Sequence, residues 1–317
     1  MTASDAVTGR WDSQYHAPVM VEEVVDLLKG AREVLDCTLG GGGHSEALLA
    51  AGASVTALDQ DEAAINEARK RLAAYEAAGR FRALRGNFSD VDQLPELQQR
   101  QFAGILADLG VSSHQIDADD RGFSFRPGAL LDMRMDSRAT TTGADLLNTL
   151  DEAALTRLFR EYGDEPRASR LAREVLRRRE NRPMKVSDDL VGAIRGSFGA
   201  RSGPSDFARL FQAVRIAVND ELGALERALP LLRNRLAPNG VLAVIAYHSG
   251  EDRIVKNAFR DWSRDCVCPP RQLQCTCGGK NSLGELVTRK AIKADAEEIE
   301  KNSRSRSARL RAWRKAA

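Results

Sequence analysis

One stretch near the N-terminus constrains the fold more than any other part of the sequence. An apolar run, Glu33 to Thr38, leads through a cluster of four glycines into a helical pattern from Ser45 to Ala51. A second apolar run, Ala53 to Leu58, then ends at the carboxylate of Asp59. Glycines let the backbone approach a bound ligand, and an acid at a strand end can accept hydrogen bonds from ribose hydroxyls. This order of elements therefore predicts a nucleotide-type cofactor site.

The same alternation of strands and helices continues along the chain. A helix is predicted from Asp61 to Tyr75, and further strands at Phe81–Arg85, Phe102–Ala107 and Val241–Ala246. A turn is predicted at Pro238–Gly240, directly before the last of these strands. Strands that alternate with helices at this spacing predict an α/β fold, a doubly wound parallel sheet with helices on both faces.

The length of 317 residues is enough for two domains. Between residues 119 and 213 only helical patterns occur, and the strand pattern returns afterwards. We therefore predict a discontinuous Rossmann-like domain, residues 1–118 and 214–317, which is interrupted by a helical insert, residues 119–213, that recognises the substrate. Two late runs, Glu285–Ala291 and Ser307–Trp313, predict a final antiparallel pair of strands.

The glycine-rich loop distinguishes between two cofactors. The dinucleotide-binding fingerprint, G-x-G-x-x-G, ends in a small residue that lets the helix pack closely on the strand. If the count starts at Gly40 or Gly41, that last position falls on Ser45 or Glu46. An acid at the end of the first strand, Asp36, is the pattern of class I methyltransferases. The sequence therefore favours S-adenosyl-L-methionine over NAD, and a class I methyltransferase over an NAD-dependent oxidoreductase.

A second acid is placed where ligands bind in such sheets. Asp108 ends the strand that begins at Phe102, and the carboxyl ends of parallel strands form the ligand crevice. Amino-methyltransferases usually carry an Asp- or Asn-Pro-Pro-aromatic motif there, whereas this chain reads Asp108-Leu-Gly-Val. Asp108 is accordingly a catalytic candidate, with a helix cap as the alternative. His248, which follows the returning strand, is a second catalytic candidate.

Charge is distributed unevenly along the chain. The net charge is +2, but residues 301–317 hold seven basic residues and no acid, which leaves the remainder mildly acidic. A helix rich in arginine is also predicted at Ser169–Glu180. Both segments suit contacts with nucleic-acid phosphates, although a solvated surface is the alternative. No apolar run approaches a membrane span and no secretory signal begins the chain, so we expect a cytoplasmic protein without membrane contact.

Four cysteines form two tight pairs. Cys266 and Cys268 are separated from Cys275 and Cys277 by six residues. Four thiolates can hold a metal such as zinc, but the C-x-C steps are tighter than the usual C-x2-C. The spacing alone favours free or redox-labile cysteines, and no metal ligand is assigned.

Several longer motifs lie between residues 15 and 313. They are Tyr15-His16-Ala-Pro18-Val19, Gly42-Gly43-His44-Ser45, Asp108-Leu-Gly-Val-Ser-Ser113, Arg121-Gly-Phe-Ser-Phe125, Leu131-Asp-Met-Arg-Met-Asp136, Phe211-Gln212-Ala-Val-Arg-Ile216, Val218-Asn219, His248-Ser249 with Glu251-Asp252-Arg253, and Arg306-Ser-Ala308 with Leu310-Arg311. Together these motifs resemble one family, the bacterial 16S rRNA (cytosine-N4)-methyltransferases called RsmH or MraW.

The resemblance implies an activity and a set of binding residues. The activity is methylation of the N4 amino group of a cytosine in the decoding centre of 16S rRNA, with S-adenosyl-L-methionine as cofactor and 16S rRNA or the small ribosomal subunit as partner. We expect a monomer or a weak homodimer. The resemblance implies cofactor contacts from Gly42, Gly43, His44, Asp59, Phe88, Asp108 and Gln115. Of these, Asp59 would bind the ribose and Phe88 would lie against the adenine.

This chain departs from the family pattern in two places. At residues 246–253 the family reads Ser-Phe-His-Ser-Leu-Glu-Asp-Arg, whereas this chain reads Ala246-Tyr247-His248-Ser249-Gly250 followed by Glu251-Asp252-Arg253. Before Phe211-Gln212 the family has His-Pro-Ala-Thr-Arg, of which this chain keeps only Arg209. Both departures concern contact with the substrate rather than the cofactor. Two alternative functions stay open from the sequence: methylation of DNA at cytosine N4, and a non-catalytic RNA-binding factor in ribosome assembly.

Overall fold

The computed structural model describes residues 11, 18–111, 116, 121–269, 272 and 274–317. The chain forms two compact units, Met1–Gly110 with Leu222–Ala317, and Val111–Glu221. The predicted domain boundary between residues 213 and 214 falls inside helix α10 (Pro204–Asn219), which belongs to the second unit. Within the described residues, no helix is both long and apolar enough to cross a membrane.

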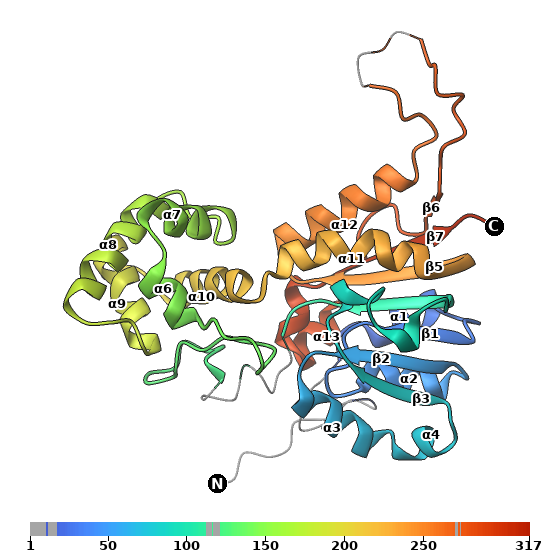
Figure 1. The fold of residues 1–317 in the computed structure, drawn as a ribbon, viewed down its shortest axis with the longest axis horizontal. Coiled ribbons are helices and arrows are strands. Elements are labelled where there is room, and N and C mark those ends of the chain that lie inside the picture. The colour runs from blue at the N-terminus through green and yellow to red at the C-terminus, as the bar shows by residue number, and fades with distance from the viewer. Residues whose placement is uncertain (1–10, 12–17, 112–115, 117–120, 270–271, 273) are drawn as a thin grey trace. The chain divides into compact units, whose positions relative to one another are not determined.

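The first unit is built on a seven-stranded sheet (Figure 1). Its order is β3-β2-β1-β4-β5-β7-β6, with the first five strands parallel and the last two pairings antiparallel. The strands are β1 (Glu33–Asp36), β2 (Ser54–Asp59), β3 (Phe81–Arg85), β4 (Phe102–Asp108), β5 (Leu236–Ala246), β6 (Gly284–Leu286) and β7 (Arg309–Lys315). The parallel doubly wound sheet and the final antiparallel pair are both as predicted.

Helices cover both faces of this sheet, with α11 and α12 on one face and α2 and α3 on the other (Figure 1). Adjacent strand residues point to opposite faces, so Val34 packs into one core cluster and Leu35 into the other. This double burial explains why the strands are continuous apolar runs. The helices are α1 (Val21–Leu27), α2 (Gly43–Ala50), α3 (Glu62–Arg71), α4 (Ala73–Ala77), α11 (Glu221–Arg235), α12 (Ser249–Trp262) and α13 (Ala296–Lys301), with short 3-10 turns at Phe88–Asp90, Pro95–Leu97 and Ser303–Ser307.

Strand β5 begins earlier than the sequence predicts. A turn was expected at Pro238–Gly240, but those residues form an irregular start of the strand, where the pairing with β4 jumps from Phe102–Leu236 to Gly104–Val241. Asn239 has a φ of 64°, and a side chain at Gly240 would lie 3.0 Å from the carbonyl oxygen of Phe102. The turn residues therefore make a bulge rather than a chain reversal.

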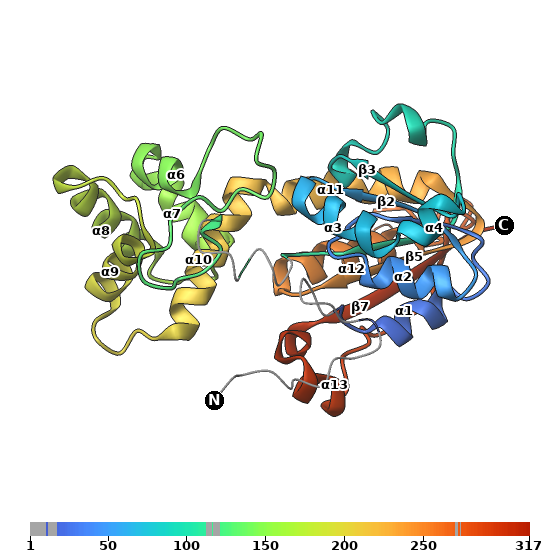
Figure 2. The same cartoon turned by 90° about the horizontal axis from the view of Figure 1, so that it is seen from below.

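The second unit is helical (Figure 2). Its helices are α6 (Gly143–Thr149), α7 (Glu152–Glu161), α8 (Ala168–Asn181), α9 (Ser187–Phe198) and α10. They enclose their own core, which includes Leu155, Phe159 and Leu190. In the described part of this unit the β pairing is limited to an isolated bridge between Leu130 and Val186, in agreement with the predicted helical insert.

The basic C-terminal segment is not an isolated tail. It forms β7 beside β5, and Arg311 donates to both oxygens of Asp252 on α12, at 2.7 and 3.2 Å. Arg314 pairs with Glu285 at 3.1 Å. On α8, the side chains of Arg177 and Arg178 likewise pair with Glu174. These ion pairs reduce the charge that both segments offer to a polyanion, so their contact with phosphate stays a prediction.

The Arg311–Asp252 pair predicts a stability effect. Although burial opposes it, hydrogen bonds from Arg311 and Arg309 hold the pKa of Asp252 below its usual value. Asp252→Asn should lower the free energy of unfolding in urea by about 1–3 kcal/mol at pH 7, because charge-assisted hydrogen bonds are lost. The deficit should shrink as the pH falls below about 4, where the wild-type carboxylate is itself protonated.

Glu285→Gln is the matched control. It breaks the exposed ion pair between Glu285 and Arg314, and Arg314 lies on β7 like Arg311. Its effect should stay within about 0.5 kcal/mol. Equal losses in the two variants would show that the buried pair does not anchor β7.

Candidate functional site

The candidate site lies at the carboxyl ends of neighbouring parallel strands. Asp36 ends β1, Asp59 ends β2 and Asp108 ends β4, while Tyr247 follows β5. The pairings β2-β1-β4-β5 place these strand ends along one edge of the sheet. This edge is where open α/β sheets bind ligands, and the predicted acids are brought together there.

The glycine-rich loop has a backbone that side chains would disturb. Gly40 and Gly42 have φ values of 50° and 78°, in the region that favours glycine. A Cβ at Gly42 would lie 3.2 Å from Ala68 Cβ, and one at Gly43 would lie 2.7 Å from Pro18 Cγ. The loop therefore combines a left-handed backbone with close packing: Gly41, Gly42 and Gly43 are buried, whereas Gly40 is half-buried.

Asp36 stabilises the two ends of the glycine-rich loop through hydrogen bonds. It is fully buried, and its carboxylate accepts hydrogen bonds from the Ser45 hydroxyl at 2.7 Å and the Thr38 amide at 3.1 Å. Burial raises the pKa of Asp36 above its ordinary value. The acid that identifies the methyltransferase pattern thus ties the start of α2 to β1.

Asp59 holds the other side of the loop. Its Oδ2 accepts a hydrogen bond from the Gly40 amide at 2.8 Å, and its Oδ1 accepts one from the Asp61 amide at 2.9 Å. Burial raises the pKa of Asp59 to about 6. An ionised carboxylate has about four acceptor positions, so these two bonds leave capacity for two hydroxyl donors.

Asp108 has a less polar environment. Its Oδ1 accepts a hydrogen bond from the Tyr247 hydroxyl at 2.8 Å, and its own amide donates to Thr38 Oγ1 at 2.7 Å. Burial raises the pKa of Asp108 to about 7, against the lowering effect of the Tyr247 hydrogen bond. The carboxyl group therefore exchanges its proton near neutral pH, which suits a group that accepts a proton during a reaction.

His44 lies beside Asp108. Its Nε2 donates to the Val19 carbonyl at 2.9 Å, and burial lowers its pKa, so the ring is neutral at pH 7. Its Nδ1 consequently carries a lone pair and lies 3.7 Å from Asp108 Oδ2. The Nε2 hydrogen bond therefore ties the start of α2 to Val19, and the ring adds no charge beside Asp108.

His248 occupies the N-cap of α12. Its Nδ1 accepts a hydrogen bond from the Gly250 amide at 3.2 Å, whereas its buried Nε2 lies 3.2 Å from Glu251 Oε1 but makes no hydrogen bond. Glu251 in turn accepts a hydrogen bond from the Tyr247 amide at 2.8 Å. The Nδ1 hydrogen bond caps α12, and the predicted role of His248 in catalysis stays a prediction.

Two predicted cofactor contacts remain, Phe88 and Gln115. Phe88 begins the 3-10 turn after β3 and packs, half-buried, against the sheet core. The neighbouring Asn87 donates to the Gln60 side chain at 3.2 Å, which connects the ends of β3 and β2. Gln115 lies outside the described residues.

Two supporting residues were not predicted. Thr38 connects β1 to β4 through the Asp108 amide, and Arg71 of α3 donates to the Gly41 carbonyl at 3.3 Å and to Glu46 at 2.7 Å. Thr38 is the last residue of a predicted strand, at the end where ligands bind, which is a usable signal. Nothing in the pattern of α3 separates Arg71 from its neighbours Arg69 and Lys70.

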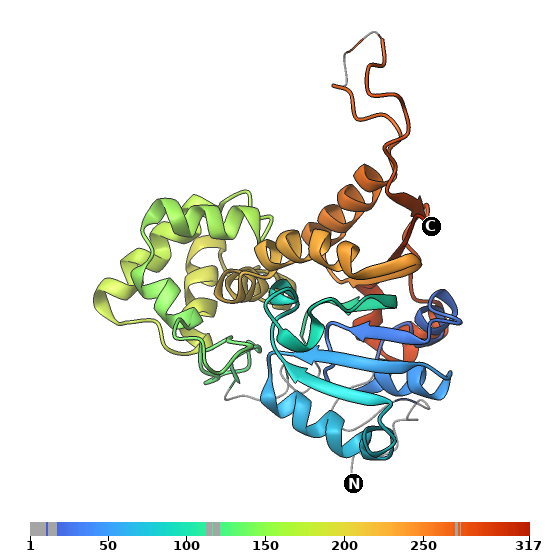
Figure 3. The ribbon, with the colours of Figure 1, turned by 45° about the vertical axis from the view of Figure 1, so that its right-hand side comes forward.

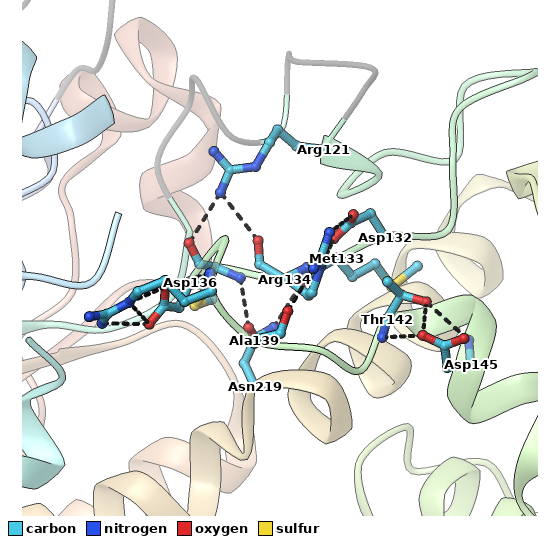
Figure 4. Close-up of polar contacts among 11 residues, drawn as sticks. Arg121, Asp132, Met133, Arg134, Asp136, Ala139, Thr142, Asp145 and Asn219 are labelled. Carbon is cyan, nitrogen blue, oxygen red and sulfur yellow. Dashed lines mark hydrogen bonds and ion pairs between the residues drawn. The ribbon is translucent and has the colours of Figure 1, made fainter. Parts of the chain in front are cut away.

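The motif Leu131–Asp136 forms a polar network within the helical unit (Figure 4). Arg134 binds the carboxylate of Asp132 through Nε at 2.7 Å and Nη2 at 2.6 Å. Asn219 of α10 donates to the Met133 carbonyl at 2.7 Å and accepts from the Met135 amide at 2.8 Å. Two motifs that are 84 residues or more apart therefore hold one loop in place.

The fold and site define a class of enzyme. A sheet of this order, a glycine-rich loop after β1 and an acid after β2 fit S-adenosyl-L-methionine, because the loop has a left-handed backbone without side chains and Asp59 has unused acceptor positions. The chain is a class I methyltransferase that depends on this cofactor.

Comparison with known proteins identifies the family. The MraW methylase family profile matches residues 13–316, and the chain belongs to this family. It is 59% identical to the ribosomal RNA small subunit methyltransferase H of Gemmatimonas aurantiaca, over 95% of this chain and 96% of the relative. The protein of the same name from Symbiobacterium thermophilum is 45% identical, over 94% of this chain and 96% of the relative.

A substitution at Asp59 tests the cofactor site. Asp59→Ala should weaken binding of S-adenosyl-L-methionine by about 2–4 kcal/mol, because charge-assisted hydrogen bonds are lost and the Gly40 amide loses its acceptor. Isothermal titration calorimetry measures the change. Asp61→Ala is the control: Asp61 caps α3 through the Ala63 amide, so its loss should cost about 1 kcal/mol of stability and little affinity. Unchanged affinity in a folded Asp59→Ala protein would remove Asp59 from the site.

Proposed function

We propose that this enzyme methylates the N4 amino group of a cytosine in the decoding centre of 16S rRNA. The observation that carries the proposal is the match of nearly the whole chain to relatives named ribosomal RNA small subunit methyltransferase H. A proton-exchanging carboxyl group at the sheet edge, Asp108, supports an amino group as acceptor. The partner is 16S rRNA or the small subunit, the helical unit recognises it, and the enzyme acts in the cytoplasm as a monomer or weak homodimer.

Cofactor binding is assigned to residues of the sheet edge. When bound, S-adenosyl-L-methionine supplies a methyl group made electrophilic by its sulfonium. Asp59 would bind the ribose and Phe88 would cover the adenine. The other contacts would come from Gly42, Gly43, His44, Asp108 and Gln115.

Asp108 has the properties needed to activate the nucleophile. The N4 lone pair of cytosine is delocalised into the ring, so it must be freed and aimed before it can attack. An ionised Asp108 that accepts one N4 hydrogen would draw the nitrogen towards tetrahedral geometry and stabilise the positive charge that develops on it. N4 gains a bond to carbon and loses one proton. A carboxylate with a pKa of about 7 can take that proton and return it to solvent.

Tyr247 would position Asp108. Its hydroxyl donates to one carboxylate oxygen, which leaves the second oxygen for the substrate. Its ring also packs against Gly110, where an added Cβ would lie 3.4 Å from Tyr247 Cδ2. The family pattern has phenylalanine at this position, so the hydroxyl is a property of this chain.

The target cytosine must leave its stack to reach a strand-end site. Tyr247, Phe123 and Phe125 are the aromatic candidates for stacking on the flipped base. Phe125 packs edge-to-face against Phe207 and Phe211 at 5.9 and 6.1 Å between ring centroids, within the helical unit. Tyr247, beside Asp108, is therefore the preferred candidate.

Loss of the gene tests the proposed function. Mass mapping of 16S rRNA from cells that lack this protein should reveal one cytosine in the decoding centre without its N4 methyl group. Re-expression of the wild-type protein should restore the mark, and re-expression of Asp59→Ala should restore less of it. Transfer of labelled methyl groups to DNA but not rRNA would favour the DNA alternative. An unchanged rRNA together with no transfer to either would favour a non-catalytic assembly factor.

Asp108→Asn separates binding from chemistry. The variant should bind S-adenosyl-L-methionine within about tenfold of wild type, a loss below about 1.4 kcal/mol. Its single-turnover transfer to small subunits from the deletion strain should fall by about 100-fold or more, which corresponds to about 2.7 kcal/mol of barrier. Equal losses in affinity and rate would make Asp108 a cofactor ligand only, and near-normal turnover would direct attention to His248.

Tyr247→Phe tests the tuning of Asp108. With saturating cofactor, the wild-type single-turnover rate should rise with pH through an apparent pKa near 7, since the ionised carboxylate is the active form. Removing the hydroxyl removes a hydrogen bond that favours ionisation, so the profile should move upwards by about one pH unit. The variant should be about tenfold slower at pH 6 and close to wild type at pH 9.

Tyr75→Phe is the control, since Tyr75 packs against the core away from Asp108 and should leave the profile unchanged. An equal loss of rate at every pH in Tyr247→Phe would indicate a purely structural hydroxyl.

A further inference from the structure

The segment from residue 263 to 283 projects from the sheet unit between α12 and β6 (Figures 1 and 3). Its described residues contain neither helix nor strand. Hydrogen bonds close its base, from the Leu283 amide to the Trp262 carbonyl at 2.8 Å and from the Asn281 amide to the Asp265 carbonyl at 3.2 Å. Beyond the base, Val267 is 60% exposed. A projecting segment of this length has no hydrophobic core of its own, so another interaction must stabilise its conformation.

The four cysteines of this segment converge. Their Sγ atoms all lie within 4.8 Å of one another, although Cys266 and Cys277 stand 11 residues apart. Four of the separations are 3.7 Å for Cys266–Cys275, 3.8 Å for Cys266–Cys277, 4.0 Å for Cys268–Cys275 and 3.5 Å for Cys275–Cys277. All four are free thiols.

These separations match the edges of a zinc-thiolate tetrahedron. With a Zn–S bond of about 2.3 Å, the ligand sulfurs of a tetrahedral site lie about 3.8 Å apart. The observed values of 3.5–4.0 Å fall around that edge. A pair of cysteines poised for a disulfide accounts for one short distance, but not for a shared set of separations among four sulfurs.

Backbone amides also point at the sulfurs. The Val267 amide donates to Cys277 Sγ at 3.4 Å, and the Thr276 amide donates to Cys268 Sγ at 3.3 Å. Each amide lies between two cysteines of one pair and reaches a sulfur of the other pair. Such hydrogen bonds stabilise thiolate charge and fix the orientation of the ligands, as outer contacts do around metal sites.

We infer that Cys266, Cys268, Cys275 and Cys277 bind one structural zinc ion that orders the projecting segment. Zinc displaces the thiol protons and binds four thiolates in a closed tetrahedron, so it leaves no position for catalysis. The tight C-x-C steps made this site doubtful from spacing alone. The convergence of the two steps in one segment resolves that difficulty, because each step supplies two of the four corners of the same tetrahedron.

Metal analysis of the purified full-length protein tests the inference. After growth with zinc and passage over a chelating resin, wild-type protein should retain about one zinc ion per chain by mass spectrometry. Cys266→Ser and Cys277→Ser should each retain less than about a tenth as much. Thr276→Ala, which lies between two of the ligands and keeps all four thiols, is the matched control and should retain the wild-type amount. Circular dichroism and binding of S-adenosyl-L-methionine should be unchanged in all three, because the cysteines lie outside both core clusters of the sheet unit.

Two further measurements make the result decisive. Reduced, metal-free protein titrated with Co²⁺ without oxygen should develop the intense visible bands of tetrahedral cobalt-thiolate, with an end point near one equivalent. Removal of zinc should also accelerate cleavage by trypsin after Arg264 and Lys280 while the rest of the chain stays resistant. Absence of zinc together with absence of cobalt bands would overturn the inference. Iron in place of zinc, or cysteines recovered as disulfides from protein kept anaerobic, would overturn it as well.

Discussion

Buried carboxylates at one sheet edge are the constraint on which the rest of the site depends. Asp36, Asp59 and Asp108 end adjacent strands, and burial raises the pKa of each. Taking a carboxylate out of water is costly unless hydrogen bonds replace the lost hydration. The surrounding structure meets this requirement differently at each position: a helix hydroxyl at Asp36, loop amides at Asp59, and one phenolic hydroxyl at Asp108. Asp108 accepts one of these hydrogen bonds and Asp59 accepts two, and the pKa of Asp108, about 7, is the higher of the two, against about 6 for Asp59.

Local features of the fold could be predicted from the sequence. Strand β3 has the predicted bounds, and β1, β2 and β4 differ by one or two residues, because doubly buried strands are unbroken apolar runs. The glycine-rich loop and its two flanking acids were also identified, since glycines and strand-end acids are local signals. The Pro238–Gly240 turn was wrong, because a bulge and a turn use the same residues and only the partner strand separates them.

Long-range partners could not be predicted. The hydroxyl bound to Asp108 comes from Tyr247, 139 residues away, and no periodicity in the sequence connects the two. The same limit applies to charge. Arg311 counts as a cation in a basic segment, yet its partner Asp252 lies on another element and removes much of that charge. A count of basic residues gives the net charge of a segment, whereas the pairing decides how much of it a polyanion meets.

The sheet is assembled from two pieces of chain, and this has a consequence for synthesis on the ribosome. Strand β4 pairs with β5, but its partner begins only at Leu236, so about 130 residues must be translated before that edge is covered. At about 5–20 residues per second, the interval is roughly 7–26 s. The helical unit is contiguous and emerges in that time, so it can complete its core while the first four strands wait with an apolar edge exposed. For this protein the vulnerable species is therefore a half-built sheet on the ribosome, where a chaperone that shields the β4 edge would have its greatest effect.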